Sequence, residues 1–316
     1  MQDKVLAIIP CLNEELTIQQ TIKSIQNVSE KIKIVVVDNN STDNTVKKAE
    51  ELDIQVIRCF DQGKGKALKF AFSKIENNYD FIFICDGDLT YGMENLEKAI
   101  STMRNNNLDM ILGVRKSDKS TEESDKKIYR FGHQSANIIL SKIFSLLFNL
   151  KISDIFTGWR LMSLAFVKSF QGGQSAFEIE AELNTHAYVL NARIGEIPVS
   201  YSARANGSIS KLNTYRDGFK IIRKQLKMYR YEKPLVAFSI LASPWFVIGM
   251  WLNYVAVRGY LETGLVEKFP SLIAGSALLI LSGLLWIAGV ILERITQFRH
   301  EQVRSLFSSF QPKVIN

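Results

Sequence analysis

Cysteine is scarce in this sequence, with three residues in a chain of 316. Cys11, Cys59 and Cys85 form no CxxC pair, and each lies in or beside an apolar run. This spacing excludes a CxxC redox or zinc motif, and the apolar surroundings predict reduced thiols in a protein core. Histidine is equally scarce, and the three histidines are not spaced as metal ligands.

Other common features are also missing. The sequence has no GxxxxGK[ST] phosphate loop, no internal repeat and no low-complexity segment. The N-terminal run VLAIIP is too short for the hydrophobic region of a signal peptide, and it is followed by the polar NEE. These absences exclude a P-loop nucleotide site and predict that residues 1 to about 230 form a cytoplasmic domain.

Two long stretches lack charge altogether. Residues 234–257 and 272–292 contain no Asp, Glu, Lys or Arg, and each has about the 20 residues that cross a bilayer. Basic residues precede the first stretch and follow the second, while the loop between them is balanced in charge. The positive-inside rule therefore predicts a transmembrane hairpin with both flanks in the cytoplasm. The alternative is a pair of buried helices in a soluble core.

These stretches divide the chain into four predicted parts. They are a cytoplasmic domain (1–213), a basic amphipathic juxtamembrane helix (214–233), a transmembrane hairpin (234–292) and a cytoplasmic tail (293–316). The expected location is the inner membrane of the cell, with several spans and both termini cytoplasmic. The net charge is +7, but the basic residues concentrate beside the two spans. Anionic lipid is therefore favoured over nucleic acid as a partner.

Within residues 1–213, short β-rich apolar runs alternate with longer amphipathic stretches. The runs are VLAIIP, KIVVVD, IQVIRC, FIFICD and MILGVR, and helices are expected from about Glu14, Asp43, Lys64 and Glu94. This alternation predicts an α/β domain whose mostly parallel sheet is flanked by helices. Ligands of such sheets bind at the carboxyl ends of the strands, where this sequence repeatedly places polar residues.

The run FIFIC leads directly into Asp86-Gly87-Asp88. Two carboxylates so close together repel each other unless a cation lies between them. Mg²⁺ or Mn²⁺ suits such a pair, because the ion takes oxygen ligands and keeps other positions for waters and diphosphate oxygens. Bound there, it would neutralise charge that builds on a leaving diphosphate. The sequence therefore predicts a metal site at Asp86 and Asp88, although a DxD sequence also occurs by chance.

Two other segments are suited to a nucleotide. Asp38 closes KIVVVD and is followed by NNSTDNT, where it can accept hydrogen bonds from a ligand or simply belong to a turn and helix cap. GKGKAL places Lys64 and Lys66 among glycines at an expected helix start, an arrangement that favours a bound phosphate. Both segments lie where the ligand of the sheet is expected.

The order of the motifs resembles that of the family 2 glycosyltransferases of GT-A (Rossmann-like) fold. The motifs are IIPCLNEE, VVVDNNSTDNT, GKGKAL, CDGDLTY, GVR, DIFTGWRLMS and FEIEAEL. Within that family, residues 4–215 resemble the polyprenyl-phosphate glycosyltransferases, which include dolichyl-phosphate mannose synthase and bacterial undecaprenyl-phosphate enzymes. The resemblance implies an enzyme that transfers a sugar from a nucleotide-sugar donor to the phosphate of a membrane polyprenol, for use in cell-envelope glycans.

The resemblance also implies residues on the donor side. Those expected to hold the nucleotide-sugar are Pro10, Asn13, Glu14, Asp38, Lys64, Asp86 and Arg160. Some relatives have glutamine two residues after the second aspartate as a further metal ligand. This chain has Thr90 there, which leaves the third protein ligand open.

For the acceptor phosphate, the resemblance implies Arg130, Arg204, Ser210, Lys211 and the acid Glu180. It implies Asp154, Arg115 and Asp88 as catalytic residues. Plainer interpretations exist for three of these: Arg130 as a surface residue, Asp154 as a cap, and Glu180 as an acid favoured by a helix N-terminus. Glu178 is an alternative to Glu180.

The expected reaction is a single in-line displacement at the anomeric carbon, with inversion. A polyprenyl phosphate oxygen is already anionic, so the attack needs positioning and charge compensation more than a strong base. A UDP-hexose or UDP-N-acetylhexosamine is the favoured donor because the motifs look bacterial, and GDP-mannose is the alternative. The rival functions are a processive polysaccharide synthase, whose QxxRW signature is missing here, and a non-catalytic nucleotide-sugar-binding membrane protein. The oligomeric state stays open, a homo-oligomer included.

Overall fold

The computed structural model describes residues 3–116, 131–172, 179–202, 223, 225–265 and 268–311. The chain divides into two compact units, one comprising residues 1–218 and 303–316 and the other residues 219–302. The division into four parts, with the boundaries expected from the sequence, stays a prediction. Of the expected juxtamembrane helix, residues 225–232 are helical, and residues 214–222 lie outside the described part of the chain.

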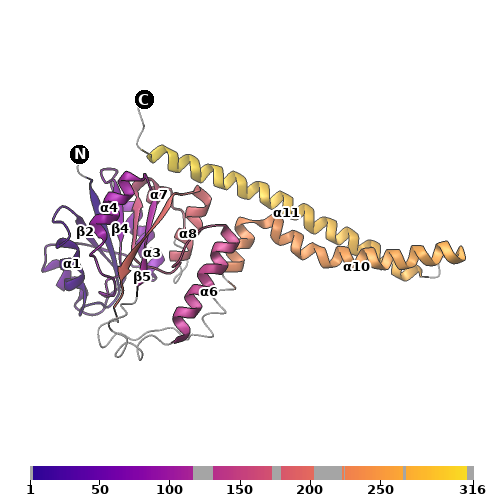
Figure 1. Ribbon diagram of the computed structural model, residues 1–316, viewed down its shortest axis with the longest axis horizontal. Coiled ribbons are helices and arrows are strands. Elements are labelled where there is room, and N and C mark those ends of the chain that lie inside the picture. Colours follow the sequence, from indigo (N-terminus) through magenta and orange to yellow (C-terminus); the bar gives the residue numbers. More distant parts are fainter. Residues whose placement is uncertain are drawn as a thin grey trace. The chain divides into compact units, whose positions relative to one another are not determined.

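The first unit contains a seven-stranded sheet with the order β3-β2-β1-β4-β6-β5-β7 (Figure 1). The strands are β1 Val5–Cys11, β2 Lys33–Asp38, β3 Gln55–Arg58, β4 Phe81–Ile84, β5 Met110–Lys116, β6 Arg160–Ser163 and β7 Ile194–Ser200. All pairings are parallel except those of β6, which runs antiparallel to both β4 and β5. The expected mostly parallel sheet is therefore confirmed.

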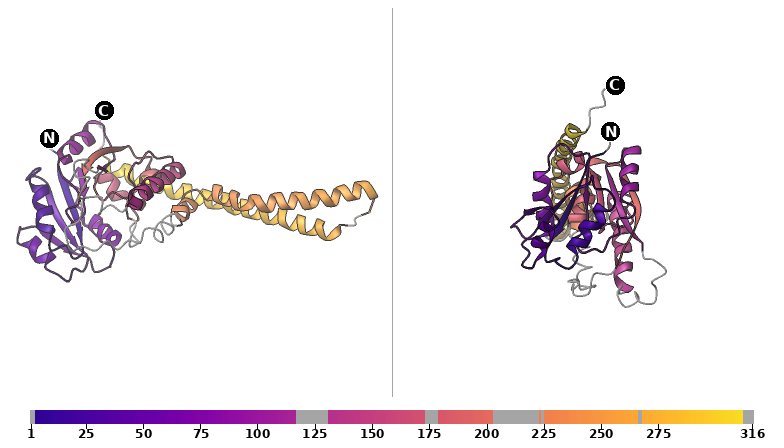
Figure 2. Two further views of the ribbon diagram at one scale, coloured as in Figure 1. Left: turned by 60° about the horizontal axis from the view of Figure 1, so that its bottom comes forward. Right: turned by 90° about the vertical axis from the view of Figure 1, so that its left-hand side faces the viewer.

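Helices cover both faces of this sheet (Figure 2). They are α1 Ile18–Gln26, α2 Thr45–Glu50, α3 Lys64–Lys74, α4 Leu96–Asn105, α6 Phe131–Phe148, α7 Leu164–Ser169 and α8 Ile179–Leu190. Alternate residues of β1 face one cluster, in which Ile18 and Ile22 of α1 and Leu96 of α4 are buried. Helix α3 contacts β1 and β2, and α7 contacts β4 and β6. The period-2 pattern of β1 thus supplies apolar residues to two layers.

Most helix starts were predicted to within four residues. Helix α3 begins at Lys64 as expected, and α2 and α4 begin two residues after the expected Asp43 and Glu94. Helix α1 begins at Ile18 rather than near Glu14, because the intervening residues form a turn in which the Thr17 and Ile18 N–H groups donate to Glu14 O. The three cysteines are buried and unpaired, in agreement with the prediction of reduced core thiols.

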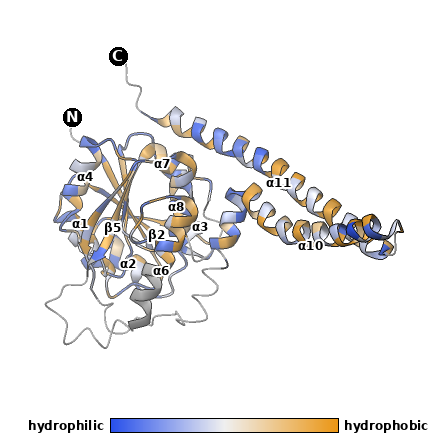
Figure 3. Cartoon of the chain, turned by 45° about the vertical axis from the view of Figure 1, so that its right-hand side comes forward, coloured by the Kyte–Doolittle hydropathy of each residue, from blue (hydrophilic) through white to orange (hydrophobic). Residues whose placement is uncertain are grey.

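The second unit contains helix α10, Pro234–Thr263, and most of helix α11, Phe269–Phe310. Both helices are long and apolar enough to cross a membrane. In their most hydrophobic 18-residue windows only 11% and 17% of the residues are buried, which contrasts with the core helices of a soluble protein. Two exposed apolar helices of this kind indicate association with a membrane. Hydrophilic residues are frequent along the C-terminal part of α11 and again where α10 ends (Figure 3).

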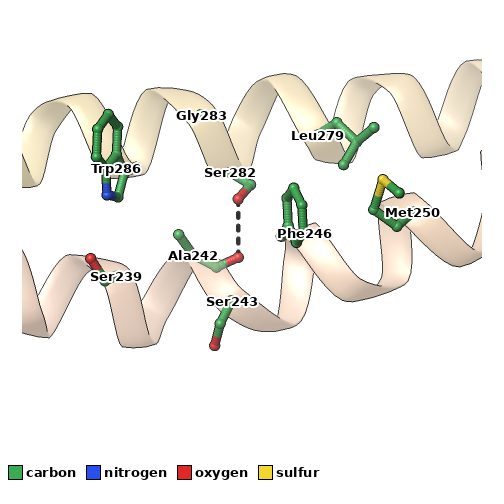
Figure 4. Close-up of a pocket in the computed structure, with 9 residues that line it drawn as sticks. All are labelled: Ser239, Ala242, Ser243, Phe246, Met250, Leu279, Ser282, Gly283 and Trp286. Atoms are coloured by element: carbon green, nitrogen blue, oxygen red, sulfur yellow. Dashed lines mark hydrogen bonds between the residues drawn. The ribbon is translucent and has the colours of Figure 1, made fainter.

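Small and polar residues join α10 to α11. The Ser282 hydroxyl donates to Ala242 O over 3.2 Å, beside a pocket lined by Phe246 and Trp286 (Figure 4). A Cβ atom added to Gly249 would lie 2.9 Å from the carbonyl oxygen of Gly275, so the backbones approach closely only because no side chain intervenes. Small residues and hydroxyl bonds of this kind are typical of helix pairs in membranes.

Candidate active site

The carboxyl ends of β1 and β2 are joined by hydrogen bonds between the loops that follow them. In the sheet Cys11 is paired with Asp38, so the next residues of both strands lie side by side. The Asn13 N–H donates to Ser41 Oγ over 3.0 Å, and the Thr42 N–H donates to Asn13 Oδ1 over 2.8 Å. Asn13 has a φ of 59°, a left-handed conformation that asparagine adopts more readily than most residues. Asn13 therefore holds the two loops together.

Asp38 and Glu14 are fixed by the same pair of loops. The Ser41 N–H donates to Asp38 Oδ1 over 3.1 Å, and Asp38 is buried at the end of β2. The Glu14 N–H donates to Thr45 Oγ1 over 2.8 Å. Asp38 thus belongs to a turn in this structure, which is the alternative to ligand binding that the sequence left open. The expected contacts of Pro10, Asn13, Glu14 and Asp38 with a nucleotide stay predictions.

Asn39 links this region to the start of α3, a role that the sequence reasoning missed. Its Nδ2 donates to Cys59 O over 3.0 Å and to Asp61 O over 2.7 Å, and its Oδ1 accepts from the Gly63 N–H over 2.7 Å. One buried amide therefore satisfies three backbone groups of the segment that leads into Lys64. An asparagine directly after a strand-end aspartate was the available signal, but its partners lie about twenty residues further along the chain.

The Asp86-Gly87-Asp88 turn follows β4 at the same edge of the sheet. Asp88 is buried, and its Oδ1 accepts from the Thr90 N–H over 3.2 Å and from Thr90 Oγ1 over 2.6 Å. Thr90 therefore orients Asp88. Gly158 packs against Asp86 so closely that a Cβ atom added there would lie 2.3 Å from Asp86 Oδ2.

Lys64 lies between Asp86 and Glu180. Its Nζ is 2.5 Å from Asp86 Oδ1 and 2.6 Å from Glu180 Oε1. Burial lowers the pKa of Lys64, but the two carboxylates outweigh burial and hold the pKa above its ordinary value. The structure thus brings together Lys64 and Asp86, both expected on the donor side, and places Glu180, expected on the acceptor side, in the same cluster.

The residues at this edge fit a divalent cation. Asp86 already has a positive charge at its Oδ1, and hard oxygen donors are what Mg²⁺ and Mn²⁺ take. Among the residues that the structure describes, no group of three or more His, Cys, Asp and Glu side chains gathers as a metal site. Asp86 and Asp88 would therefore hold the ion as a pair, and waters and diphosphate oxygens would supply the other ligands.

Arg115 and Asp154, both expected to be catalytic, form an ion pair. Arg115 Nε donates to Asp154 Oδ2 over 2.6 Å, and Arg115 Nη2 donates to Asp154 Oδ1 over 2.8 Å. The guanidinium also lies 5.2 Å above the centre of the Tyr201 ring. Tyr201 in turn packs edge-on against Tyr91, whose hydroxyl accepts from the Gly158 N–H over 2.9 Å. Tyr91 and Tyr201 were not singled out from the sequence.

Arg160, expected to bind the donor, is only 1% exposed. Its guanidinium donates to Thr157 O, Ile155 O and Asn184 Oδ1 over 3.0, 3.1 and 2.7 Å. Burial lowers the pKa of Arg160 to about 10, which leaves it protonated at neutral pH. In this structure Arg160 therefore joins β6 to α8 and has no exposed face for a sugar. Asn184, its partner, was not anticipated.

Four expected acceptor-side residues cannot be placed. Arg130, Arg204, Ser210 and Lys211 lie outside the residues that the structure describes, as does Glu178. Their assignment to the acceptor phosphate stays a prediction.

Comparison with known proteins finds a family for this chain. The model of "Glycosyl transferase family 2" matches residues 6–170. An uncharacterized protein of Shigella flexneri is 37% identical over 151 residues, which cover 48% of this chain and 92% of that protein. A protein of Pyrococcus furiosus named dolichol-phosphate mannosyltransferase is 26% identical over 290 residues, which cover 84% of this chain and 79% of that protein.

Solved structures confirm the expected GT-A fold. The glucosyl-3-phosphoglycerate synthase of Mycobacterium tuberculosis, solved with Mn²⁺, UDP-glucose and phosphoglyceric acid, aligns with a TM-score of 0.55 and 18% identity. The alignment covers 72% of this chain and 80% of that one. At this identity the likeness concerns the fold alone.

Proposed function

We propose that this chain, which belongs to glycosyl transferase family 2, transfers a sugar from a nucleotide-sugar to a polyprenyl phosphate at the membrane surface. The observation that carries the proposal is that one chain combines a strand-end site suited to a metal and a diphosphate with two exposed apolar helices able to cross a membrane. Such helices hold the site at the membrane, where a lipid-linked acceptor lies. A phosphate on a lipid has to be met at the bilayer surface.

The relatives support both halves of this proposal. One relative is named for mannosyl transfer to dolichol phosphate, and the match covers 84% of this chain. The solved neighbour holds Mn²⁺ together with UDP-glucose on the same fold. We favour a UDP-hexose or UDP-N-acetylhexosamine as donor and undecaprenyl phosphate as acceptor, with GDP-mannose as the alternative donor. The product would be a lipid-linked sugar for the modification of cell-envelope glycans.

The proposed step is one displacement with inversion. A polyprenyl phosphate oxygen forms a bond to the anomeric carbon while the bond from that carbon to the nucleoside diphosphate breaks, and the diphosphate leaves with the electron pair. A divalent cation held by Asp86 and Asp88 would neutralise the charge that develops on the leaving diphosphate. Lys64 stands beside Asp86 with a second positive charge. Because the attacking oxygen is already anionic, positioning contributes more than a strong base.

Asp154 and Arg115 take positioning roles in this proposal. Each is the other's partner in two hydrogen bonds, so Asp154 is not a lone base and Arg115 is not a lone cation. The pair holds the carboxyl end of β5 in place, next to where we expect the acceptor to bind. Arg130, Arg204, Ser210 and Lys211 would supply the contacts to the acceptor phosphate.

The proposed orientation follows from the flanking charge. Lysines and arginines lie before 234 and after 292, and the positive-inside rule predicts both flanks of the hairpin in the cytoplasm. The sheet unit and both termini would then lie on the cytoplasmic side of the inner membrane, where nucleotide-sugars are made. Labelling of single cysteines introduced near 265 and 311 with a membrane-impermeant reagent in intact cells tests this orientation.

The decisive test of the function is transfer by the purified protein. Detergent-solubilised enzyme is incubated with Mn²⁺, a short polyprenyl phosphate and, in turn, UDP-glucose, UDP-N-acetylglucosamine and GDP-mannose. We expect one sugar to enter the lipid phase as a monoglycosyl phosphate, and EDTA to stop the reaction. A long polymer would indicate a processive synthase instead. Nucleotide-sugar binding without any transfer would indicate a non-catalytic binding protein.

The acceptor assignment has its own test. Arg130→Ala and Lys211→Ala should each weaken the use of polyprenyl phosphate about thirtyfold, because a lost charge-assisted bond to phosphate costs on the order of 2 kcal/mol. Arg130→Lys should recover part of this, since an ammonium cannot form the two parallel bonds of a guanidinium. Calorimetric titration of the donor should show nearly unchanged affinity. Lys227→Ala, an exposed lysine of the helical residues 225–232, is the matched control.

A further inference from the structure

The ammonium of Lys64 occupies the place of a cation at one of the two expected metal ligands. Its Nζ is 2.5 Å from Asp86 Oδ1, closer than an ordinary ion pair needs to be. The side chains of Lys64 and Asp86 are 29% and 25% exposed, so the pair is open to exchange with solutes. A divalent ion that takes Asp86 as a ligand therefore meets a positive charge that is already bound there.

The surrounding structure keeps Lys64 in reach of Asp86 without fixing its ammonium. Gly63, the residue before Lys64, is held by its hydrogen bond to the buried Asn39. The lysine stem has four flexible carbons, so the ammonium can move while the backbone stays. Glu180, at 2.6 Å from Nζ, offers a second carboxylate that keeps the ammonium close when Asp86 is taken.

We propose that Lys64 is the resident counter-ion of Asp86 and that it makes metal binding and diphosphate binding depend on each other. Without a nucleotide, Lys64 competes with the metal for Asp86. A bound diphosphate gives the ammonium new anionic partners, so Lys64 turns away from Asp86 and the metal gains a ligand. By linkage, the metal in turn releases Lys64 toward the diphosphate. This inference rests on the proposed function, since it assumes that metal and diphosphate share the site.

The arrangement would keep the site from binding a divalent ion tightly when no nucleotide-sugar is present. A site of two bare carboxylates binds divalent ions whether or not a substrate is present. With Lys64 between Asp86 and Glu180, part of the negative charge of the metal-free site is already compensated, and the full metal affinity develops only when the donor arrives. The protein thereby assembles the metal and the nucleotide-sugar together.

Mn²⁺ binding in the absence of nucleotide tests the competition directly. The free Mn²⁺ signal in electron paramagnetic resonance is titrated with detergent-solubilised full-length protein. Lys64→Gln keeps a hydrogen-bond donor between the carboxylates but removes the charge, and it should bind Mn²⁺ about tenfold more tightly than the wild type. Lys69→Met removes a charge from the same helix, where the lysine contacts Gln171 O, and should change Mn²⁺ affinity less than twofold. Equal Mn²⁺ affinity in wild type and Lys64→Gln overturns the proposal.

The same titration with saturating UDP measures the coupling. UDP tightens Mn²⁺ binding in any such site because its oxygens are ligands. Lys64→Gln should lose the share of this coupling that Lys64 contributes. The Mn²⁺ dissociation constant without UDP, divided by that with UDP, should therefore be about tenfold smaller in Lys64→Gln than in the wild type. An unchanged ratio contradicts the proposal even if the variant binds Mn²⁺ more tightly.

A reciprocal measurement does not depend on the folding of Lys64 variants. UDP affinity is measured calorimetrically in EDTA for Asp86→Asn and for Asp88→Asn, whose carboxylate is bound by Thr90. Both changes remove one negative charge, but Asp86→Asn also releases Lys64, so it should tighten UDP binding at least about threefold more than Asp88→Asn. Equal effects overturn the proposal. Wild-type protein that binds neither Mn²⁺ nor UDP would contradict the proposed function itself.

Discussion

The two charged clusters at the strand ends are built differently. In the lysine cluster, formed by Lys64, Asp86 and Glu180, one ammonium is shared by two carboxylates from different segments. In the arginine pair, formed by Arg115 and Asp154, one guanidinium is held by one carboxylate through two hydrogen bonds. The first cluster has two carboxylates for one cation, whereas the second joins one cation to one carboxylate.

The chemistry of the two cations explains what each cluster can do. An ammonium is a compact charge on a flexible stem, and it changes partners without loss of geometry. A guanidinium bound through two parallel hydrogen bonds has a fixed orientation, and leaving it requires breaking both. Burial reinforces the difference, since the side chain of Asp86 is 25% exposed and that of Asp154 only 5%. The lysine cluster is suited to exchange ligands, and the arginine pair is suited to hold shape.

Asp86→Asn should have the largest effect of these changes, on transfer activity rather than on stability. We expect transfer to fall about a thousandfold, because removal of a group that stabilises transition-state charge has costs of this order. Stability should change by less than about 1 kcal/mol, since partly exposed ion pairs contribute little. Initial rates of transfer, beside urea unfolding of the same preparation, measure both.

EDTA is the matched control for this variant. Chelation should reduce wild-type transfer to the level of Asp86→Asn and should not reduce that of the variant further. Full wild-type activity in EDTA, or a collapse of the variant's stability, would contradict the exchangeable role of the lysine cluster.

Asp154→Asn should show the opposite pattern, with a dominant effect on stability. The change removes the carboxylate that accepts two hydrogen bonds from Arg115 in a largely buried place, and breaking such a pair costs about 3 kcal/mol. Urea unfolding can be followed by the fluorescence of Trp159, the one tryptophan of residues 1–218. The double variant Arg115→Met with Asp154→Leu should regain part of the loss, because both charges of the pair are removed together. An Asp154→Asn protein of wild-type stability would show that the pair does not hold the fold.

The lysine cluster was easier to anticipate from the sequence than the arginine pair. Lys64 and Asp86 each lie directly at an element boundary that the alternation of apolar runs and helical stretches places at one edge of the sheet. The rule that parallel strands present their carboxyl ends together then brings them close. What the sequence could not show is that Glu180, 116 positions from Lys64, completes the cluster.

The arginine pair depends on a feature that the apolar pattern did not reveal. Strand β6 is four residues long and runs antiparallel between β4 and β5, so it turns the segment before it back over the sheet edge. The sequence of β6, RLMS, has no clear period-2 alternation. Its arginine, Arg160, was expected to contact a ligand. The burial of Arg160 followed instead from its position on an interior strand of the sheet, where backbone carbonyls and Asn184 accept hydrogen bonds from its guanidinium. Residue type alone does not distinguish these outcomes.

Gly158→Ala should disturb the lysine cluster directly and the arginine pair only through two tyrosines, because Gly158 lies against Asp86. The Gly158 N–H donates to Tyr91, which packs on Tyr201 under Arg115, and an added Cβ would lie 2.3 Å from Asp86 Oδ2. Asp86 would have to move, so we expect a stability loss of about 2 kcal/mol from overpacking and weaker Mn²⁺ binding. Thermal unfolding and Mn²⁺ titration measure the two effects.

Gly195→Ala is the control for Gly158→Ala. An added Cβ there would meet the end of the Leu108 side chain at 2.7 Å, which can shift, and Gly195 lies at the opposite end of the sheet in β7. It should leave Mn²⁺ affinity unchanged. Equal Mn²⁺ affinities of the two variants would show that Gly158 does not position Asp86.

Tyr201→Leu should have the smallest effect, and it tests whether stacking contributes to the rigidity of the arginine pair. The ring lies 5.2 Å from the Arg115 guanidinium and 5.1 Å from the Tyr91 ring, so its loss should cost about 1 kcal/mol of stability. Tyr201→Phe keeps both ring contacts and should cost less than half as much. Urea unfolding of the two variants gives the difference. Because these two ring contacts of Tyr201 are with Arg115 and Tyr91, Mn²⁺ affinity should be the same in both variants. A large change in Mn²⁺ affinity would show that the two clusters are coupled through the tyrosines, and that the arginine pair does more than hold shape.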